Sequence, residues 1–77
     1  MVSAYILIQT EVGKASHVTR EIGQIKGILA VDGVTGPYDV IARADADDLD
    51  GLAKEVVMKI QGVEGVTRTL TCPVLQL

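Results

Sequence analysis

The spacing of apolar and polar residues along the 77-residue chain predicts alternating strands and helices. Ala4 to Ile8 is an unbroken apolar run with β-branched and aromatic members, which is typical of a central strand that is buried on both faces. From Lys14 onward the apolar residues recur at intervals of three and four, which predicts an amphipathic helix that ends at Gly27. The apolar stripe of this helix consists of Ala15, Val18, Ile22 and Ile25.

The middle of the chain, Ile28 to Asp45, has the pattern of a β-hairpin. Two apolar runs of strand type, Ile28-Val31 and Val40-Ala44, enclose a short polar connection. The turn is placed at Gly36 to Tyr38, because glycine permits unusual backbone angles and proline fixes φ. A strand and a helix precede this hairpin and a helix and a strand follow it, so the hairpin joins two similar halves.

The second half begins with an acidic run, Asp45 to Asp50, which is typical of a helix start because carboxylates cap free N–H groups there. The predicted helix ends at Gly62. A last strand is expected from Val63 or Val66 to Leu70, with a possible continuation past Pro73, which favours an edge strand. The apolar face of the second helix is expected to contain Leu49, Leu52, Ala53, Val56 and Ile60.

An internal repeat supports this organisation. A shift of 35 residues superimposes Ile25-Ile28 on Ile60-Val63 and Tyr5-Leu7 on Val40-Ala42. Two βαβ units in tandem give a βαββαβ chain, which is the ferredoxin-like arrangement of the α+β class. Right-handed connections place both helices on one face of a four-stranded antiparallel sheet. The whole chain, residues 1–77, is therefore expected to be one domain.

The composition indicates that this domain needs a partner. A chain of this length buries only about 60% of the surface that it exposes when unfolded. Cys72 is the only cysteine and His17 the only histidine, so neither an intramolecular disulfide nor a structural zinc site is expected. Two helices cover one face of the sheet, and the other face, about 450 Å² in projection, is left with apolar residues of the first strand. We expect a second copy to cover it.

Charge and motifs exclude several function classes. A net charge of −3 argues against a nucleic-acid surface, which needs clustered Lys and Arg. No apolar run approaches the 18 residues that a membrane helix needs, so a cytoplasmic location is expected. The chain has no glycine-rich phosphate loop, and no cofactor is expected. Cys72 has no basic neighbours that would activate its thiol, so it is expected to be a small buried apolar residue.

The segment Val34-Thr35-Gly36-Pro37-Tyr38-Asp39 resembles the Val-x-Gly-x-Tyr-Asp hairpin of the effector-binding domain of the Lrp/AsnC regulators, also called the RAM domain. Gly62-Val63 after the second helix and Thr67-x-Thr69 in the last strand also fit this family, and the resemblance covers nearly the whole chain. Regulators of this family carry a helix-turn-helix domain before the effector-binding domain. Because Met1 stands only three residues before the first strand, a stand-alone form is expected.

The resemblance implies a function. Domains of this family are expected to form homodimers through their sheets, as a dimeric α+β barrel, and to assemble further into rings. It implies that amino acids or similar small molecules bind between subunits, and that full-length Lrp/AsnC-type regulators are possible partners. The implied ligand contacts are Gly36, Tyr38, Asp39, Thr67 and Thr69. Pro37 occupies a variable position and removes one backbone donor that other members of the family have.

Several of these residues also have a purely structural interpretation. The structural interpretation and the ligand contact both stay open. Asp39 follows a turn, where aspartate commonly accepts hydrogen bonds from nearby backbone N–H groups. Tyr38 could pack against a neighbouring subunit. Thr67, Thr69 and Thr71 alternate, so they are expected to share one face of a strand, where threonine is common.

Two function classes remain. One is a non-catalytic oligomeric sensor or modulator of amino-acid metabolism or transcription. The other is a small oxygenase or isomerase of the dimeric α+β barrel superfamily, whose pockets are typically lined by His, Trp, Phe or Asn. The chain contains a single His and no Phe, Trp or Asn, which argues against the enzyme.

Overall fold

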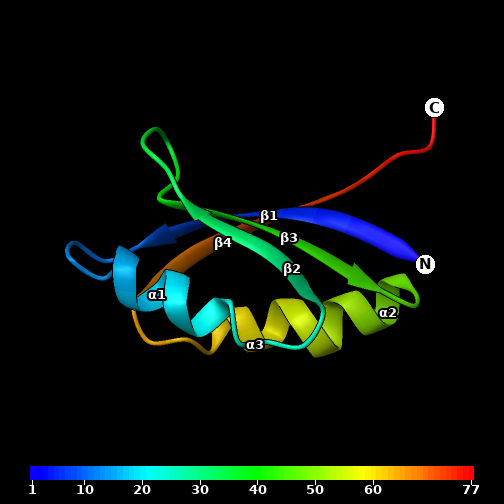
Figure 1. Cartoon of the computed structure of the whole chain (residues 1–77), viewed down its shortest axis with the longest axis horizontal. Helices are drawn as coiled ribbons and strands as arrows, with labels where there is room; N and C mark the ends of the chain where they lie inside the picture. The colour runs from blue at the N-terminus through cyan, green and yellow to red at the C-terminus, as the bar shows by residue number, and fades with distance from the viewer.

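A computed structural model describes all residues 1–77 and has the predicted βαββαβ order (Figure 1). The strands are β1 (Val2–Thr10), β2 (Ile28–Gly33), β3 (Val40–Ala46) and β4 (Val66–Pro73). They form one antiparallel sheet in the order β2-β3-β1-β4, so β1 and β3 are central and β4 is an edge strand, as expected from Pro73. The ferredoxin-like fold is confirmed.

The helices cover one face of this sheet (Figure 1). The first is α1 (Ala15–Ile22). The second is continuous over three segments, α2 (Leu49–Gly51), the π-helical η1 (Leu52–Val57) and α3 (Met58–Gln61). No helix is long and apolar enough to cross a membrane.

The core lies between the sheet and the helices. Its eleven buried members come from alternate residues of β1 and β3 and from one stripe on each helix, because successive strand residues point to opposite faces. The prediction that β1 is buried on both faces is wrong for the single chain: Tyr5 is 44% exposed and Leu7 is half-buried. The core residues are Ala4, Ile6, Ile8, Val18, Ile22, Val40, Ala42, Ala44, Leu52, Val56 and Ile60.

The first helix ends earlier than predicted, at Ile22 rather than at Gly27. The N–H groups of Gln24 and Ile25 donate to carbonyls three residues back, which tightens the chain into a turn. Gly27 then turns the chain into β2 with φ of 99°. A Cβ atom at Gly27 would lie 3.0 Å from the carbonyl oxygen of Asp45, so the glycine permits a close approach to β3.

The start of the second helix is partly as predicted. Asp48 caps it, since its Oδ1 accepts a hydrogen bond from the Gly51 N–H over 2.7 Å. Asp45, however, belongs to β3, where its carboxylate accepts a hydrogen bond from the Ser3 hydroxyl. Leu49 and Ala53 were placed on the apolar face but are exposed. The buried stripe has a strict spacing of four, from Leu52 to Val56 and Ile60, which the wider π-helical turn accommodates.

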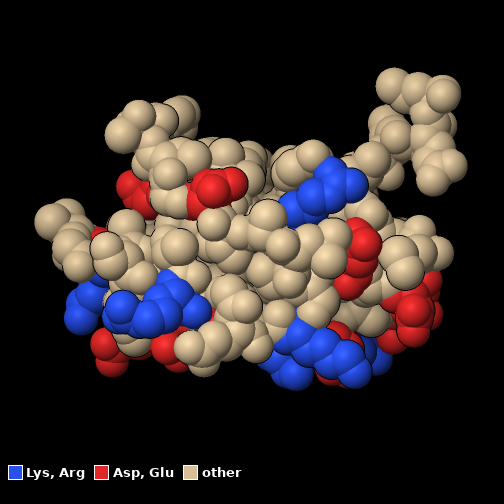
Figure 2. All heavy atoms as spheres, viewed as in Figure 1, with Lys and Arg blue, Asp and Glu red and all other residues tan.

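The opposite side of the sheet carries no helix, and we call it the helix-free face. The strand registers place twelve side chains on it, and the loop between β2 and β3 and the C-terminal residues rise above it at opposite ends (Figure 1). Lys and Arg gather mainly on the helix side of the molecule in Figure 2. The residues of the helix-free face are Ser3, Tyr5, Leu7, Gln9, Ala30, Asp32, Ile41, Arg43, Asp45, Arg68, Leu70 and Cys72.

Candidate functional site

The centre of the helix-free face is apolar. Leu7 in β1 pairs with Leu70 in β4 on one side and with Ile41 in β3 on the other, because the strands are in register there. Leu70 is 48% exposed. At the end of the face near the C-terminus, Arg43 donates a hydrogen bond to the Tyr5 hydroxyl, and its guanidinium lies 4.9 Å from the centre of the Tyr5 ring.

The other end of the face lies beneath the hairpin loop, residues 34–39. A backbone hydrogen bond of 2.9 Å from the Val34 N–H to the Asp39 carbonyl closes the loop. The Gln9 side chain donates from Nε2 to the Pro37 carbonyl over 3.0 Å, which ties the loop to β1. Gly36 is exposed at the tip and has a φ of 146°, which favours glycine.

Asp39 joins the loop to the end of β1. Its carboxylate Oδ2 accepts hydrogen bonds from the Thr10 backbone N–H over 2.8 Å and from the Thr10 hydroxyl over 3.4 Å. Its own N–H donates to the Ile8 carbonyl over 2.9 Å. Asp39 thus accepts from a backbone N–H, as its structural interpretation predicts, but the donor is Thr10 of β1 and not a residue near the turn. The other carboxylate oxygen, Oδ1, accepts no hydrogen bond within the chain.

Two of the three alternating threonines of β4 share one face, the face toward the helices. Thr69 and Thr71 pair with Ile8 and Ile6 and therefore face the helices, where the Thr69 hydroxyl accepts a hydrogen bond of 3.1 Å from Gln61 Nε2. Thr67 lies at a register shift between β1 and β4 and is exposed. The prediction of a shared face is confirmed for Thr69 and Thr71, whereas Thr67 has no partner in the ladder, because the bulge interrupts the alternation there.

The structure thus brings together some of the predicted site residues. Tyr38 and Asp39 lie at the base of the loop, and Thr10, to which Asp39 is bonded, pairs with Val66 next to Thr67. Gly36 is at the tip, and Thr69 lies on the far side of the sheet. Tyr38 is half-buried, which fits a ring that packs at the base of the loop.

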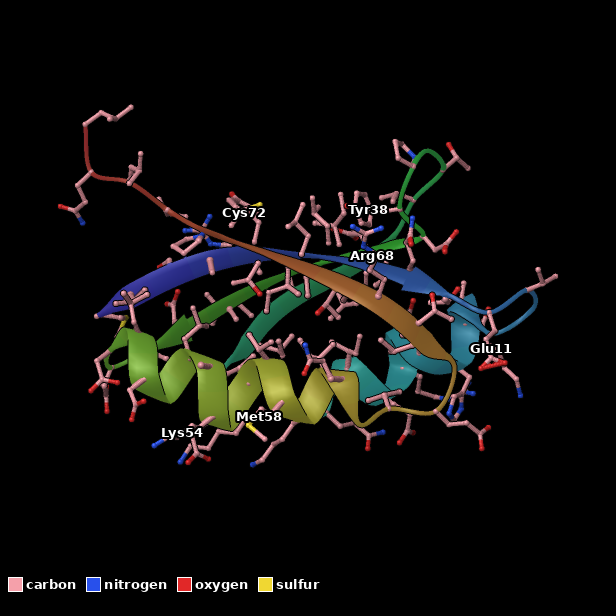
Figure 3. All side chains as sticks on the ribbon, turned by 180° about the vertical axis from the view of Figure 1, so that it is seen from behind. Glu11, Tyr38, Lys54, Met58, Arg68 and Cys72 are labelled. Carbon is pink, nitrogen blue, oxygen red and sulfur yellow. The ribbon has the colours of Figure 1, made fainter.

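Sequence reasoning missed two residues at this end of the face. Gln9 holds the loop, and Arg68 pairs with Gln9 from β4 and is exposed. Figure 3 shows Arg68 and Tyr38 on the helix-free side near the hairpin. The only available signal was that the apolar run of β1 ends in polar residues, of which Gln9 is the first.

Cys72 lies on the helix-free face and is exposed, so the prediction that it is buried is wrong for the single chain. It pairs with Tyr5 across the β1–β4 ladder and follows the same alternation as Arg68 and Leu70. Figure 3 shows its sulfur above the sheet, away from the helices.

A hollow of about 530 Å³ lies on the helix side of the molecule, beside the N-terminal part of the second helix. Two of its lysines form ion pairs, Lys54 with Asp50 at 3.3 Å and Lys59 with Glu55 at 3.8 Å, and Asp48 caps the helix. No group of three or more His, Cys, Asp or Glu side chains could hold a metal ion. Both ion pairs are exposed to solvent, so Lys54 and Lys59 have the usual role of surface charges on a helix.

Solved structures share this fold over the whole chain. TTHA0845 from Thermus thermophilus is 30% identical with a TM-score of 0.92, and the match covers 100% of this chain and 96% of that one. AsnC of E. coli is 21% identical with a TM-score of 0.89, covering 99% of this chain and 52% of AsnC. A Neisseria meningitidis transcriptional regulator, solved in complex with L-Met, is 18% identical with a TM-score of 0.83, covering 97% and 50%. The last two similarities concern the fold alone.

Among curated proteins, the homocitrate synthase of Sulfurisphaera tokodaii is 36% identical over 59 residues, which are 77% of this chain. The matched part is 13% of the length of that enzyme, so the chain spans a small fraction of it. The family model described as the Lrp/AsnC ligand binding domain matches residues 3–77. The chain therefore belongs to the Lrp/AsnC ligand-binding domain family.

Proposed function

We propose that residues 1–77 act as one ligand-binding domain that binds a small molecule, an amino acid, between subunits of an oligomer and thereby modulates transcription or amino-acid metabolism. The observation that carries this proposal is the match of residues 3–77 to a family of ligand-binding domains. The amino-acid class is supported by the L-Met complex of a regulator with the same fold. The tethered hairpin loop supplies a rigid edge for such a site, because rigid elements lower the entropic cost of binding.

The oligomer is proposed to form through the helix-free face. Leu7, Ile41 and Leu70 make its centre apolar, and isolated domains rarely expose such a patch without a partner. A second copy that packs sheet against sheet gives a closed, two-fold dimer with the same patch on both subunits. The loop and the C-terminal residues rise at opposite ends of the face (Figure 1), so they would flank a second copy that binds there.

A second candidate role follows from the homocitrate synthase similarity. A segment similar to this chain forms part of those much longer enzymes, and an equivalent fold forms about half of AsnC. We propose on this ground that the domain is a regulatory module that acts on the protein with which it assembles, either an enzyme or a full-length regulator. In neither role does the chain itself catalyse a reaction.

A thermal-shift screen tests the proposed function. The 20 L-amino acids are added one at a time in millimolar excess to the purified chain. A ligand that binds only the native state at 100 times its Kd stabilises it by about 2.7 kcal/mol, which shifts Tm by roughly 10–20 °C in a domain of this size. We expect one amino acid, or a group of similar side chains, to give such a shift. If none of them shifts Tm, the proposal of an amino-acid effector is wrong.

Asp39 provides a second test, since its carboxylate has one bonded and one free oxygen. Asp39→Asn keeps an oxygen acceptor for the Thr10 N–H but removes the negative charge, whereas Asp39→Ala removes both. We expect Asp39→Ala to lower the unfolding free energy by about 1–3 kcal/mol and Asp39→Asn to lower it less. Both variants should weaken amino-acid binding at least tenfold and leave the oligomer intact in sedimentation. Wild-type affinity in Asp39→Asn would exclude a contact between Asp39 and the ligand ammonium.

A further inference from the structure

Arg68 is an unpaired cation on the helix-free face, whose centre is apolar. The ion pairs of the chain are Lys14–Glu64, Lys54–Asp50 and Lys59–Glu55, all outside this face. The other arginine of the face, Arg43, is engaged by Tyr5, both through a hydrogen bond and over its ring. Arg68 makes no side-chain hydrogen bond within the chain, so its planar fork of donors is free.

Its position links it to the hairpin loop. Arg68 pairs directly with Gln9, and the Gln9 amide donates to the Pro37 carbonyl over 3.0 Å. Tyr38 lies at the same end of the helix-free side in Figure 3. Asp39 is attached to the opposite side of β1 through Thr10. A cation from β4 and the carboxylate of Asp39, the last loop residue before β3, therefore flank the end of β1.

These two groups match the two charges of an amino acid. Strands lie about 4.8 Å apart, so residues on the two strands that flank β1 are about 10 Å apart at their Cα atoms. A long guanidinium side chain on one side and a short carboxylate on the other can reach one small molecule between them. The free Oδ1 of Asp39 can accept from an ammonium group while Oδ2 stays bonded to Thr10.

We propose that Arg68 binds the carboxylate of the amino-acid effector. This contact makes the site select a ligand with a free carboxylate over one without it. This inference rests on the proposed function and adds to it a residue outside the hairpin and outside the threonines. Arginine suits the role because its fork donates two parallel hydrogen bonds to one carboxylate. Burial of an unpaired guanidinium between subunits would be costly, so occupancy by an anion also removes a penalty from the oligomer.

The experiment compares two ligands and four proteins. The ligands are the amino acid that gives the largest shift in the 20-member screen and its primary carboxamide, which keeps the ammonium and the side chain but lacks the negative carboxylate. The proteins are the unmodified chain, Arg68→Gln, Arg68→Lys and the control Arg20→Gln, whose arginine is exposed on α1. Affinities are measured by calorimetry and the oligomeric state by sedimentation.

The unmodified chain is expected to bind the amino acid about ten to a hundred times more tightly than the carboxamide, the range that a hydrogen bond between charged groups contributes. Arg68→Gln is expected to lose this preference and to bind both ligands like the carboxamide. Arg68→Lys should retain part of the preference, since a point charge replaces the fork. Arg20→Gln should behave like the unmodified chain.

Three results would overturn the inference. If Arg68→Gln keeps the preference for the free carboxylate, Arg68 does not bind it, although the proposed function stands. If Arg68→Gln dissociates the oligomer in the absence of any ligand, Arg68 instead pairs with a carboxylate of the second copy, such as that of Asp32 on the same face. If the unmodified chain binds none of the 20 amino acids, the proposed function fails and the inference fails with it.

Discussion

Leu7→Asp is expected to abolish the proposed dimer. Leu7 lies at the centre of the helix-free face, between Leu70 and Ile41, and is already half-buried in the single chain. Between two sheets an aspartate would be buried without a partner, which costs several kcal/mol per carboxylate even after relaxation. A two-fold interface carries the change twice, so the dimer should weaken by at least three orders of magnitude.

Sedimentation velocity over a hundredfold range of protein concentration measures this effect. The unmodified chain should sediment as a dimer or a larger assembly at micromolar concentration, and Leu7→Asp as a monomer or as unfolded chain. Leu49→Asp is the matched control, because Leu49 is 60% exposed on the helix side and an acid in the first helical turn is favourable. A folded monomer of the unmodified chain, or an intact oligomer of Leu7→Asp, would contradict the proposed interface.

The sequence predicts the element order well because each element has a distinct period. Ile6 and Ile8 alternate with Tyr5 and Leu7, which predicts a strand, and the buried residues of the second helix recur at intervals of four. The internal repeat adds a constraint on connectivity that single elements lack. The fold follows from these patterns because a ferredoxin-like chain is the simplest way to pack two right-handed βαβ units.

Each difference between the sequence-based predictions and the structure has a specific physical cause. Ile25 continues the spacing of three from Ile22, so the pattern extends the first helix, although the chain already turns after Gly23. The bulge at Thr67 shifts the register between β1 and β4, and no pattern in the sequence marks it. Asp45 resembles a helix cap by its position in an acidic run, but its partner is Ser3, 42 residues earlier in the chain.

The candidate site was harder to predict than the fold, because its contacts join residues that are distant in the sequence. Asp39 was identified through the hairpin motif, but its bond to Thr10 spans 29 residues. Arg68 stands between Thr67 and Thr69 in the sequence. Only the strand register shows that Arg68 lies on the helix-free face, opposite to Thr69. A residue that has no partner within the chain leaves no pattern in the sequence.

Ile6→Ala is expected to be the most destabilising single truncation in the chain's own core. Ile6 is fully buried on the helix side of β1, and removal of three carbon atoms from such a site costs about 2–5 kcal/mol. Small domains have unfolding free energies of only about 5–15 kcal/mol, so Tm should fall by roughly 10–30 °C. Chemical denaturation at several protein concentrations measures the loss.

Ile41→Ala is the matched control, because it removes the same atoms from the opposite face of the sheet. Ile41 pairs with Leu7, whereas Ile6 pairs with the neighbouring Ala42, so the two isoleucines differ mainly in the face that they occupy. We expect the loss for Ile6→Ala to be the same at every protein concentration, because the core lies within one chain. The loss for Ile41→Ala should arise through weaker assembly, and should shrink when the protein is diluted below its dissociation constant. Equal losses for the two variants in a dilute, monomeric sample would show that the helix-free face is packed within the single chain, and the proposed dimer would lose its physical basis.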